Sequence, residues 1–332
     1  MEDRLVKEID VVGIGNAIVD LLINTSESFL ISKSLTKGSM KLISQSEADD
    51  LILPFKSFVK SSGGSAANTL SGIAELGGKT TFIGKVRNDN FGEIFTEEIK
   101  SSGTNFKTKF SSEGESTARC VIFVTPDAER TMCTHLGTSS LLKTEDIDFE
   151  DIIKAKILYL EGYLFDSPDA KNAFINAAQI ANKHKTKVAL SLSDSFCIDR
   201  HRSDFLSLIT DNVDILFANE KEILSLFQVK MIEDAIIKAK EICDTLIITK
   251  GENGSVIINE EKQINIDPIN LGNVIDTTGA GDYYAGGFIF GYLNNNSLEI
   301  CGKMGSICAA HIITQMGSKN QSSLKDIVRN HI

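Results

Sequence analysis

The sequence lacks the features of a protein that works on nucleic acid or inside a membrane. Its 332 residues carry 34 lysines and arginines against 45 aspartates and glutamates, a net charge of −11, with no basic block. Nucleic-acid phosphates require a basic face, so we expect no nucleic-acid partner. No apolar run reaches the roughly eighteen residues of a membrane span. The charged first segment, MEDRLVKEID, also lacks the apolar core of a signal peptide;.

Cysteine is scarce, and one common cofactor motif is incomplete. The six cysteines form no CxxC pair and are too few for a disulfide scaffold, which predicts a reduced, cytoplasmic protein;. Residues 9–15, IDVVGIG, indicate a buried strand followed by a tight turn. However, Ile18 stands where a dinucleotide fingerprint has its third glycine, so a dehydrogenase is not expected;.

The stretch Asp276-Thr-Thr-Gly-Ala-Gly-Asp282 carries the strongest chemical signal. It lies between a strand-like run, residues 273–275, and a buried helical pattern over residues 283–293. Small residues at Gly279, Ala280 and Gly281 leave consecutive N–H groups uncovered, which suits an anion hole at a helix N-terminus. Asp282 beside it suits a base that takes a proton from an attacking hydroxyl. Alternatively, Asp282 only complements the helix dipole and the glycines only make the turn.

Alternating strand and helix patterns from residue 157 onward predict the fold class. Strands are expected at 157–160, 187–192, 214–217 and 245–249, and helices at 169–184, 201–210, 220–227 and 233–242. This rhythm is typical of an α/β fold with a doubly wound, mostly parallel sheet and helices on both faces. Two β-rich patches, approximately 21–43 and 107–135, predict a small β-sheet lid. No repeat or linker divides the chain, so residues 1–332 are expected to form one unit.

Further polar residues follow the expected strands, where open α/β sheets bind ligands. Asn16 and Asp20 suit hydrogen bonds to sugar hydroxyls, although turns and helix caps use the same residue types;. In SSGGSAAN, Gly64 permits close backbone approach to a ligand, and Asn68 is expected in the first turns of the helix that follows;.

Two motifs follow later strands. Asn219 and Glu222 in NEKE could hold the waters of a magnesium ion or simply begin a helix;. Thr249, Gly251 and Gly254 in TKGENG suit either a nucleotide contact or a hairpin.

Together these motifs resemble the ribokinase-like (PfkB) family of carbohydrate and nucleoside kinases. GIGNAIVD, GGSAAN, NEKE, TKGENG and DTTGAGD occur in the order typical of that family and cover nearly the whole chain. The resemblance implies transfer of the ATP γ-phosphate to a primary hydroxyl, with ATP and Mg²⁺ as cofactors. It also implies that Asp282 is the base, that Gly279, Ala280 and Gly281 form the anion hole, and that Arg130 contacts the transferring phosphate. The acceptor would be bound by Asn16, Asp20, Gly64 and Asn68, and the nucleotide by Asn219, Thr249, Gly251 and Gly254. Glu222 would hold Mg²⁺ through water, and Asp276 would lie near a K⁺ ion.

Within this family, GNAIVD and GGSAAN look closer to the adenosine kinase branch than to typical ribokinases or fructokinases. This predicts a nucleoside acceptor, adenosine, phosphorylated on its 5′-hydroxyl. Phe123, Phe165 and Phe196 are candidates for lining a base slot, with core packing as the alternative for each. A sugar kinase of the ribokinase or fructokinase type is the alternative function, and a non-catalytic ligand-binding regulator is a weaker one. The chain is expected to be a monomer or a homodimer.

Overall fold

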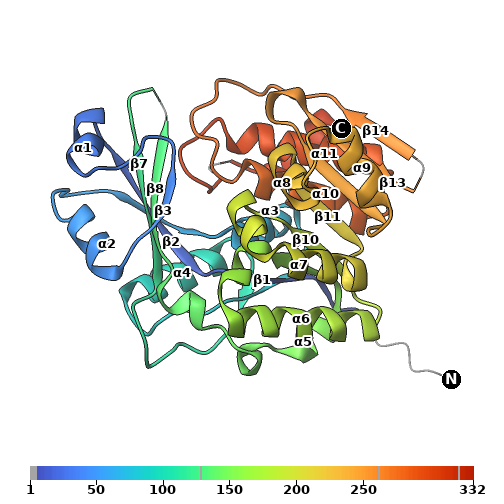
Figure 1. Ribbon diagram of the computed structural model, residues 1–332, viewed down its shortest axis with the longest axis horizontal. Helices are drawn as coiled ribbons and strands as arrows, with labels where there is room; N and C mark the ends of the chain where they lie inside the picture. Colours follow the sequence, from blue (N-terminus) through green and yellow to red (C-terminus); the bar gives the residue numbers. More distant parts are fainter. Residues whose placement is uncertain (1–5, 128, 261, 321) are drawn as a thin grey trace.

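The computed structural model describes residues 6–127, 129–260, 262–320 and 322–332. Two sheets organise the chain, a main sheet of nine strands and a small sheet of five (Figure 1). The main sheet has the order β14-β13-β12-β11-β10-β9-β1-β5-β6. Its strands are β1 Ile9–Ile14, β5 Thr80–Ile83, β6 Asn105–Phe106, β9 Ala155–Glu161, β10 Lys187–Ser191, β11 Ile215–Asn219, β12 Thr245–Thr249, β13 Ser255–Asn259 and β14 Lys262–Ile266. Neighbours from β6 to β12 are parallel, and β13 and β14 are antiparallel additions, so the expected mostly parallel sheet is confirmed.

Helices cover both faces of the main sheet because its strands are apolar on both sides. In β9, Leu158 and Leu160 belong to one hydrophobic cluster, whereas Ile157 and Tyr159 belong to the other. The first face carries α5 Phe149–Lys154, α6 Pro168–Lys183, α7 Ser195–Asn212, α8 Glu220–Phe227 and α9 Ile232–Lys240. The opposite face carries α3 Ser65–Leu76, α4 Asn90–Ser101, α10 Ala280–Leu293 and α11 Leu298–Ile312, and α12 Leu324–His331 packs beside α3 and α11. The doubly wound architecture is thereby confirmed.

The small sheet stands beside the main sheet and has the order β3-β8-β7-β2-β4 (Figure 1). Its strands are β2 Ile18–Asn24, β3 Met40–Leu42, β4 Val59–Gly63, β7 Ala118–Val124 and β8 Arg130–His135. Because side chains alternate along each strand, the two faces of this sheet have different neighbours. Leu21, Ile23 and Phe123 pack with α1 Glu27–Ser32 and α2 Gln45–Ile52, while Asp20 and Ile122 point toward the main sheet and line a cavity.

The expected β-rich patches need three corrections, although β7 and β8 pair as the antiparallel hairpin that alternation predicted. Residues 107–117 form no strand beyond a single bridge at Ser111, so the second patch begins at β7. Residues 27–32 form helix α1 instead of continuing the β-rich patch, because Ser26 caps them and Leu30 packs into the core. Sequence patterning also missed β4, which pairs antiparallel with β2. Its polar sequence VKSSG shows no apolar alternation and therefore carried no strand signal;.

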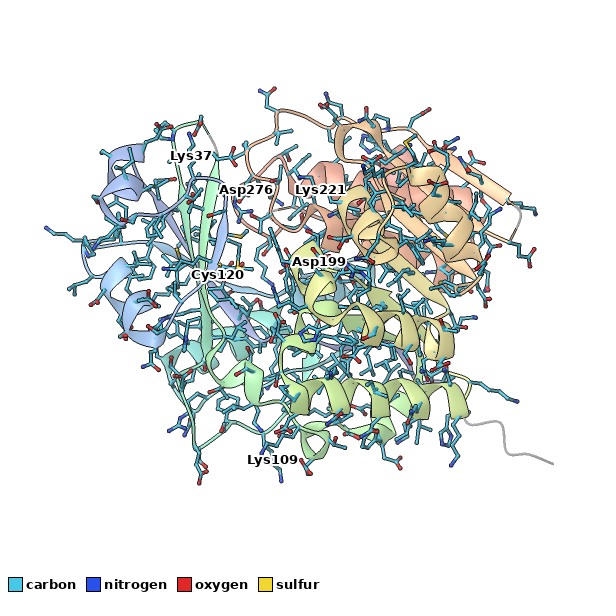
Figure 2. All side chains as sticks on the ribbon, viewed as in Figure 1. Lys37, Lys109, Cys120, Asp199, Lys221 and Asp276 are labelled. Carbon is cyan, nitrogen blue, oxygen red and sulfur yellow. The ribbon has the colours of Figure 1, made fainter. Side chains whose placement is uncertain are left out.

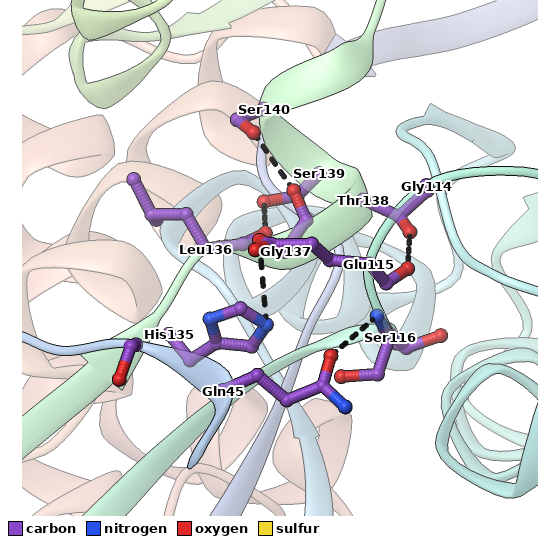
Figure 3. Close-up of polar contacts among 12 residues, drawn as sticks. Gln45, Gly114, Glu115, Ser116, His135, Leu136, Gly137, Thr138, Ser139 and Ser140 are labelled. Carbon is purple, nitrogen blue, oxygen red and sulfur yellow. Dashed lines mark hydrogen bonds and ion pairs between the residues drawn. The ribbon is translucent and has the colours of Figure 1, made fainter. Parts of the chain in front are cut away.

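Polar contacts join the segments on either side of the β7–β8 hairpin (Figure 3). After β8, a short 3-10 helix at Gly137–Leu141 lies against the segment that leads into β7. The Thr138 amide donates to the Ser116 carbonyl at 3.0 Å, and the Ser116 amide donates to the Gln45 side chain at 3.1 Å. Gly137 has a φ of +43°, and a Cβ there would lie 2.1 Å from the Ser116 carbonyl oxygen. Only glycine fits this approach without moving backbone.

Residues 273–275 do not form the expected strand. The amides of Ile275 and Asp276 both donate to the carbonyl of Ile313, just past the end of α11, so this run is held by a helix end instead of a strand. The following helix, α10, matches the expected one closely. Across the residues that the structure describes, no helix combines the length and apolar character needed to cross a membrane.

Candidate functional site

A cavity of about 610 Å³ lies between the small sheet and the carboxyl edge of the main sheet. Its lining includes predicted site residues from all five motifs and the small sheet: Asn16, Asp20, Gly64, Asn68, Arg130, Asn219, Glu222, Thr249, Gly279, Gly281 and Asp282. Figure 2 labels Cys120, which lines the cavity from β7, and Asp276, in the loop before α10 next to the lining residue Thr277. Residues far apart in sequence thus converge because parallel strands end at one edge.

The N-terminus of α10 opens into this cavity. Gly279 is its N-cap with a φ of +75°, and a Cβ on Gly281 would meet nothing within 4 Å. Among the described residues no side chain caps the helix, but the Ala280 amide donates to the Thr277 carbonyl at 3.3 Å. The open space at Gly281 still lets an anion approach the end of the helix;. Gly279 and Gly281 line the cavity as an anion hole would need, whereas the N–H of Ala280 already has a backbone partner and Ala280 lines a neighbouring cavity.

Asp282 lies in the first turn of α10 and is held from α3. Its Oδ1 accepts from the Ser65 hydroxyl at 2.6 Å, and its Oδ2 accepts from the Asn68 amide at 3.0 Å. Burial raises the pKa of Asp282, while these two hydrogen bonds act in the opposite direction;. The carboxylate is oriented by two neutral donors and has no cationic partner among the described residues, which keeps it available to accept a proton. Ser65 was not singled out from sequence, although it stands inside the quoted GGSAAN motif.

Asp20, on β2, lines the small-sheet side of the cavity. It is 7% exposed, and burial raises its pKa to about 7 against the lowering effects of Arg130 and Lys319. Gly63 lies against it so closely that a Cβ would be 2.3 Å from the carboxylate. Gly64 has a φ of +98°, and a Cβ there would lie 2.2 Å from the carbonyl oxygen of Asn16. The paired glycines thus bring β4, β2 and the turn after β1 into contact.

Asn16 is bound to a residue that sequence reasoning missed. Its side-chain amide donates to Oε1 of Glu161 at 3.0 Å, and both residues are almost fully buried. Glu161 ends strand β9 and lines the same cavity. Its only sequence signal was a single charged residue closing an apolar strand, in ILYLEG.

Arg130 and Asp276 form an ion pair that sequence reasoning did not anticipate. Arg130 Nε lies 3.1 Å from Asp276 Oδ1, although the hydrogen-bond angle is poor and its Nη2 is buried without a partner. The other donors to Asp276 are Thr278, through its amide and hydroxyl to Oδ1, and the Gly317 amide, to Oδ2. Both oxygens of Asp276 therefore accept hydrogen bonds, and a K⁺ ion near this residue stays a prediction.

Asn219 and Glu222 form a reciprocal cap at the start of α8. Glu222 accepts from the Asn219 amide at 2.9 Å and side chain at 2.7 Å, while Asn219 Oδ1 accepts from the Glu222 amide. The helix-start interpretation is therefore correct for these contacts, yet both side chains also line the cavity. Burial raises the pKa of Glu222 to about 7, and the carboxylates of Asp194 and Asp282 contribute to the rise.

A second cavity of about 610 Å³ adjoins the first. The predicted nucleotide residues Thr249, Gly251 and Gly254 line it, together with Ala280 and Gly281 of the α10 N-terminus. Thr249 and Gly281 also line the first cavity. Two ligands, one in each cavity, would therefore meet at the start of α10, next to Asp282.

The outer part of the first cavity is apolar. Small-sheet residues on one side of it are Ile18, Met40, Leu42, Ile122 and Met132, and Tyr163 and Phe196 come from the main-sheet side. Phe196 is 70% exposed, so its ring is accessible to a ligand in the cavity. Phe123 and Phe165, the other two candidate lining residues, are instead buried in the hydrophobic cores, where Phe165 stacks on Phe205 at 4.1 Å.

Comparison with known proteins identifies the family. The pfkB family carbohydrate kinase model matches residues 33–325. A probable sugar kinase protein from Rhizobium etli has a similar structure, with 41% identity, a TM-score of 0.93 and coverage of 98% of each chain. The structure of adenosine kinase from Sinorhizobium meliloti is similar too, with 42% identity, a TM-score of 0.92 and coverage of 97% of this chain and 99% of that one. Adenosine kinase from Saccharomyces cerevisiae is 26% identical over 92% of this chain and 94% of its own length. The chain therefore belongs to the pfkB family of carbohydrate kinases and is a phosphotransferase.

Proposed function

We propose that this kinase transfers the γ-phosphate of ATP to the 5′-hydroxyl of a nucleoside, with adenosine as the preferred acceptor. The apolar outer part of the first cavity carries this proposal. A free sugar presents hydroxyls on all sides and gains little from such walls, whereas a purine has two flat apolar faces. Met40 and Leu42, both partly exposed, stand on the small sheet, and Phe196 and Tyr163 stand on the opposite wall. These four side chains suit the two faces of a base.

The proposed reaction uses the geometry at the start of α10. Asp20 and Asn68 hold the ribose hydroxyls, which leaves the 5′-oxygen beside Asp282. Asp282 takes the hydroxyl proton as that oxygen attacks the γ-phosphorus, and the bond from this phosphorus to the bridging oxygen breaks, so ADP leaves. The uncovered N–H groups near Gly279 and Gly281 stabilise the charge on the phosphoryl group during transfer.

Positive charge for the phosphates is proposed to come from Arg130 and from Mg²⁺. The buried Nη2 of Arg130 has no hydrogen-bond partner in the described residues, so an incoming phosphate oxygen would satisfy it;. Glu222 likewise pairs with no lysine or arginine in the described part of the chain, and it shares the cavity with Asp194 and Asp282. Within the described residues no three acidic, histidine or cysteine side chains are grouped to ligate a metal directly, so Glu222 would hold Mg²⁺ through water. The ion would supply charge neutralisation to the phosphates when bound. The same proposal treats the small sheet as a lid that excludes water when it closes.

A substrate panel tests the proposed function. Purified protein is supplied with Mg·ATP and with adenosine, inosine, ribose or fructose, and ADP release is followed by a coupled assay. We expect saturable turnover of adenosine with the lowest KM in the panel. The Asp282→Asn variant, prepared in parallel, controls for contaminating kinases because it should lose most activity. Turnover of ribose or fructose without turnover of adenosine contradicts the nucleoside assignment.

A sugar acceptor is the second candidate, favoured by the similarity to the probable sugar kinase from Rhizobium etli. The same transfer centre would serve it, because Asp20, Asn68 and Asp282 are suited to any polyol that offers a primary hydroxyl. The panel separates the two candidates by the acceptor alone. Ligand binding without any Mg·ATP-dependent transfer would instead indicate a regulator built on the kinase fold.

A further inference from the structure

Glu161 is a buried carboxylate to which no role has been assigned above. It is 1% exposed, and its two oxygens accept three N–H groups. Oε1 accepts from the Asn16 amide at 3.3 Å and from the Asn16 side chain at 3.0 Å. Oε2 accepts from the amide of Ala66 at 2.8 Å. One side chain at the end of β9 thus joins the turn after β1 to the first turn of α3.

Both partners of Glu161 lead directly to the reaction centre. Asn16 lines the acceptor cavity, and the carbonyl of Asn16 packs against Gly64. Ala66 lies in the same helical turn as Ser65 and Asn68, the two residues that hydrogen-bond Asp282. A shift of the Glu161 carboxylate would therefore move acceptor contacts and the base together.

The packing around Glu161 also explains Gly15, the second glycine of the GIGN motif. A Cβ on Gly15 would lie 2.4 Å from Oε2 of Glu161 and 2.6 Å from Cβ of Ala66. Such distances are far inside van der Waals contact, and a side chain there would displace the carboxylate or the helix. Gly15 is thus explained by the approach of Glu161, without any dinucleotide.

We propose that Glu161 is a positioning residue for phosphotransfer, which holds the Asn16 turn and the first turn of α3 in the geometry that acceptor binding needs, and that Gly15 makes room for it. A carboxylate is suited to this task because all three neighbours are donors and it offers only acceptors. Glutamine has the same shape but only one acceptor oxygen, so its NH₂ group must face either Ala66 N–H or the two donors of Asn16. The proposal rests on the proposed function above.

The decisive experiment compares wild type with Glu161→Gln, Gly15→Ala and a matched control, Asp151→Asn. Asp151 is another buried carboxylate, but it pairs with Lys107 outside both cavities. Hydrogen bonds to charged groups predict that Glu161→Gln raises the KM for the acceptor by roughly tenfold to a hundredfold, with a lower kcat. Gly15→Ala should raise the same KM. The control should lower Tm without raising KM.

A double-mutant analysis distinguishes the positioning role of Glu161 from a general effect on stability. If Glu161 acts through Asn16, the effects of Glu161→Gln and Asn16→Ala on KM should not add, because both break the same contact. Additive effects, or a Glu161→Gln variant with lowered Tm but unchanged KM and kcat, would overturn the proposal. If Glu161→Gln does not fold, Gly15→Ala decides: a raised KM supports the proposal and an unchanged KM overturns it.

Failure of the proposed function is distinguishable from failure of this inference. The kinetics use whichever acceptor wild type phosphorylates, so a sugar acceptor leaves the test intact. If wild type phosphorylates nothing in the panel, adenosine binding is measured by calorimetry in the same variants. Weaker binding in Glu161→Gln and Gly15→Ala still supports the positioning role, and equal binding overturns it.

Discussion

Replacing Asp282 by asparagine removes the proposed base and preserves its shape. In the native site the Ser65 hydroxyl donates to Oδ1 and the Asn68 amide donates to Oδ2. Asparagine can satisfy both neighbours, because its oxygen can still accept from Asn68 while its NH₂ donates to the Ser65 oxygen. The substitution therefore changes proton affinity and charge without leaving a buried group unpaired, which makes it a clean test.

Two magnitudes follow from this geometry. A positioned general base contributes about 10²- to 10⁴-fold, or about 3–5 kcal/mol in transition-state free energy, so kcat should fall by that factor. The thermal stability of the variant, in contrast, should not fall. Burial raises the pKa of Asp282 above its unfolded value, so its favourable contribution to stability is present at acidic pH and is lost as pH rises through the folded pKa;. At pH 8 the neutral asparagine should leave Tm equal or higher.

Steady-state kinetics and thermal unfolding at pH 8, on the same preparations of wild type and Asp282→Asn, check both expectations. Nucleoside affinity, measured by calorimetry without ATP, should change little. A kcat within tenfold of wild type would refute the role of Asp282 as base. A large fall in Tm would instead show that the carboxylate is needed for folding, and the loss of activity could no longer be ascribed to proton transfer.

Three other outcomes are expected. The KM for the acceptor should fall as pH rises through about 7, because ionised Asp20 accepts hydroxyl hydrogen bonds, and Asp20→Asn should remove this dependence;. Phe196→Ala should raise the KM for adenosine by roughly two- to tenfold, from about 0.5–1.5 kcal/mol of aromatic contact, and leave a sugar acceptor unaffected. Gly137→Ala should lower the free energy of unfolding by about 1–3 kcal/mol in urea titrations, because its Cβ would meet the Ser116 carbonyl; Gly103→Ala, with positive φ but more room, should cost less;.

The sequence predicted the parts of the site that rest on local chemistry. Gly279 and Gly281 beside Asp282 indicated a helix N-terminus because small residues and a first-turn carboxylate act within a few positions of each other. The apolar strands from β9 to β12 were visible because burial on both faces leaves continuous hydrophobic runs. Contacts over long sequence separations were not visible. In the sequence, Glu161 is only an isolated charge at the end of a strand, and no local pattern predicts the ion pair between Arg130 and Asp276.

The buried carboxylates explain why this site should depend on its ligands for stability. Asp20 and Glu222 each have a pKa raised to about 7, and burial is the largest cause for both. Near neutral pH each therefore carries a desolvation cost that the protein alone does not fully offset. Acceptor hydroxyls at Asp20 and a hydrated cation at Glu222 would supply the missing partners, so binding free energy offsets this cost. Ligands that bind at these two carboxylates should therefore raise the stability of the folded protein.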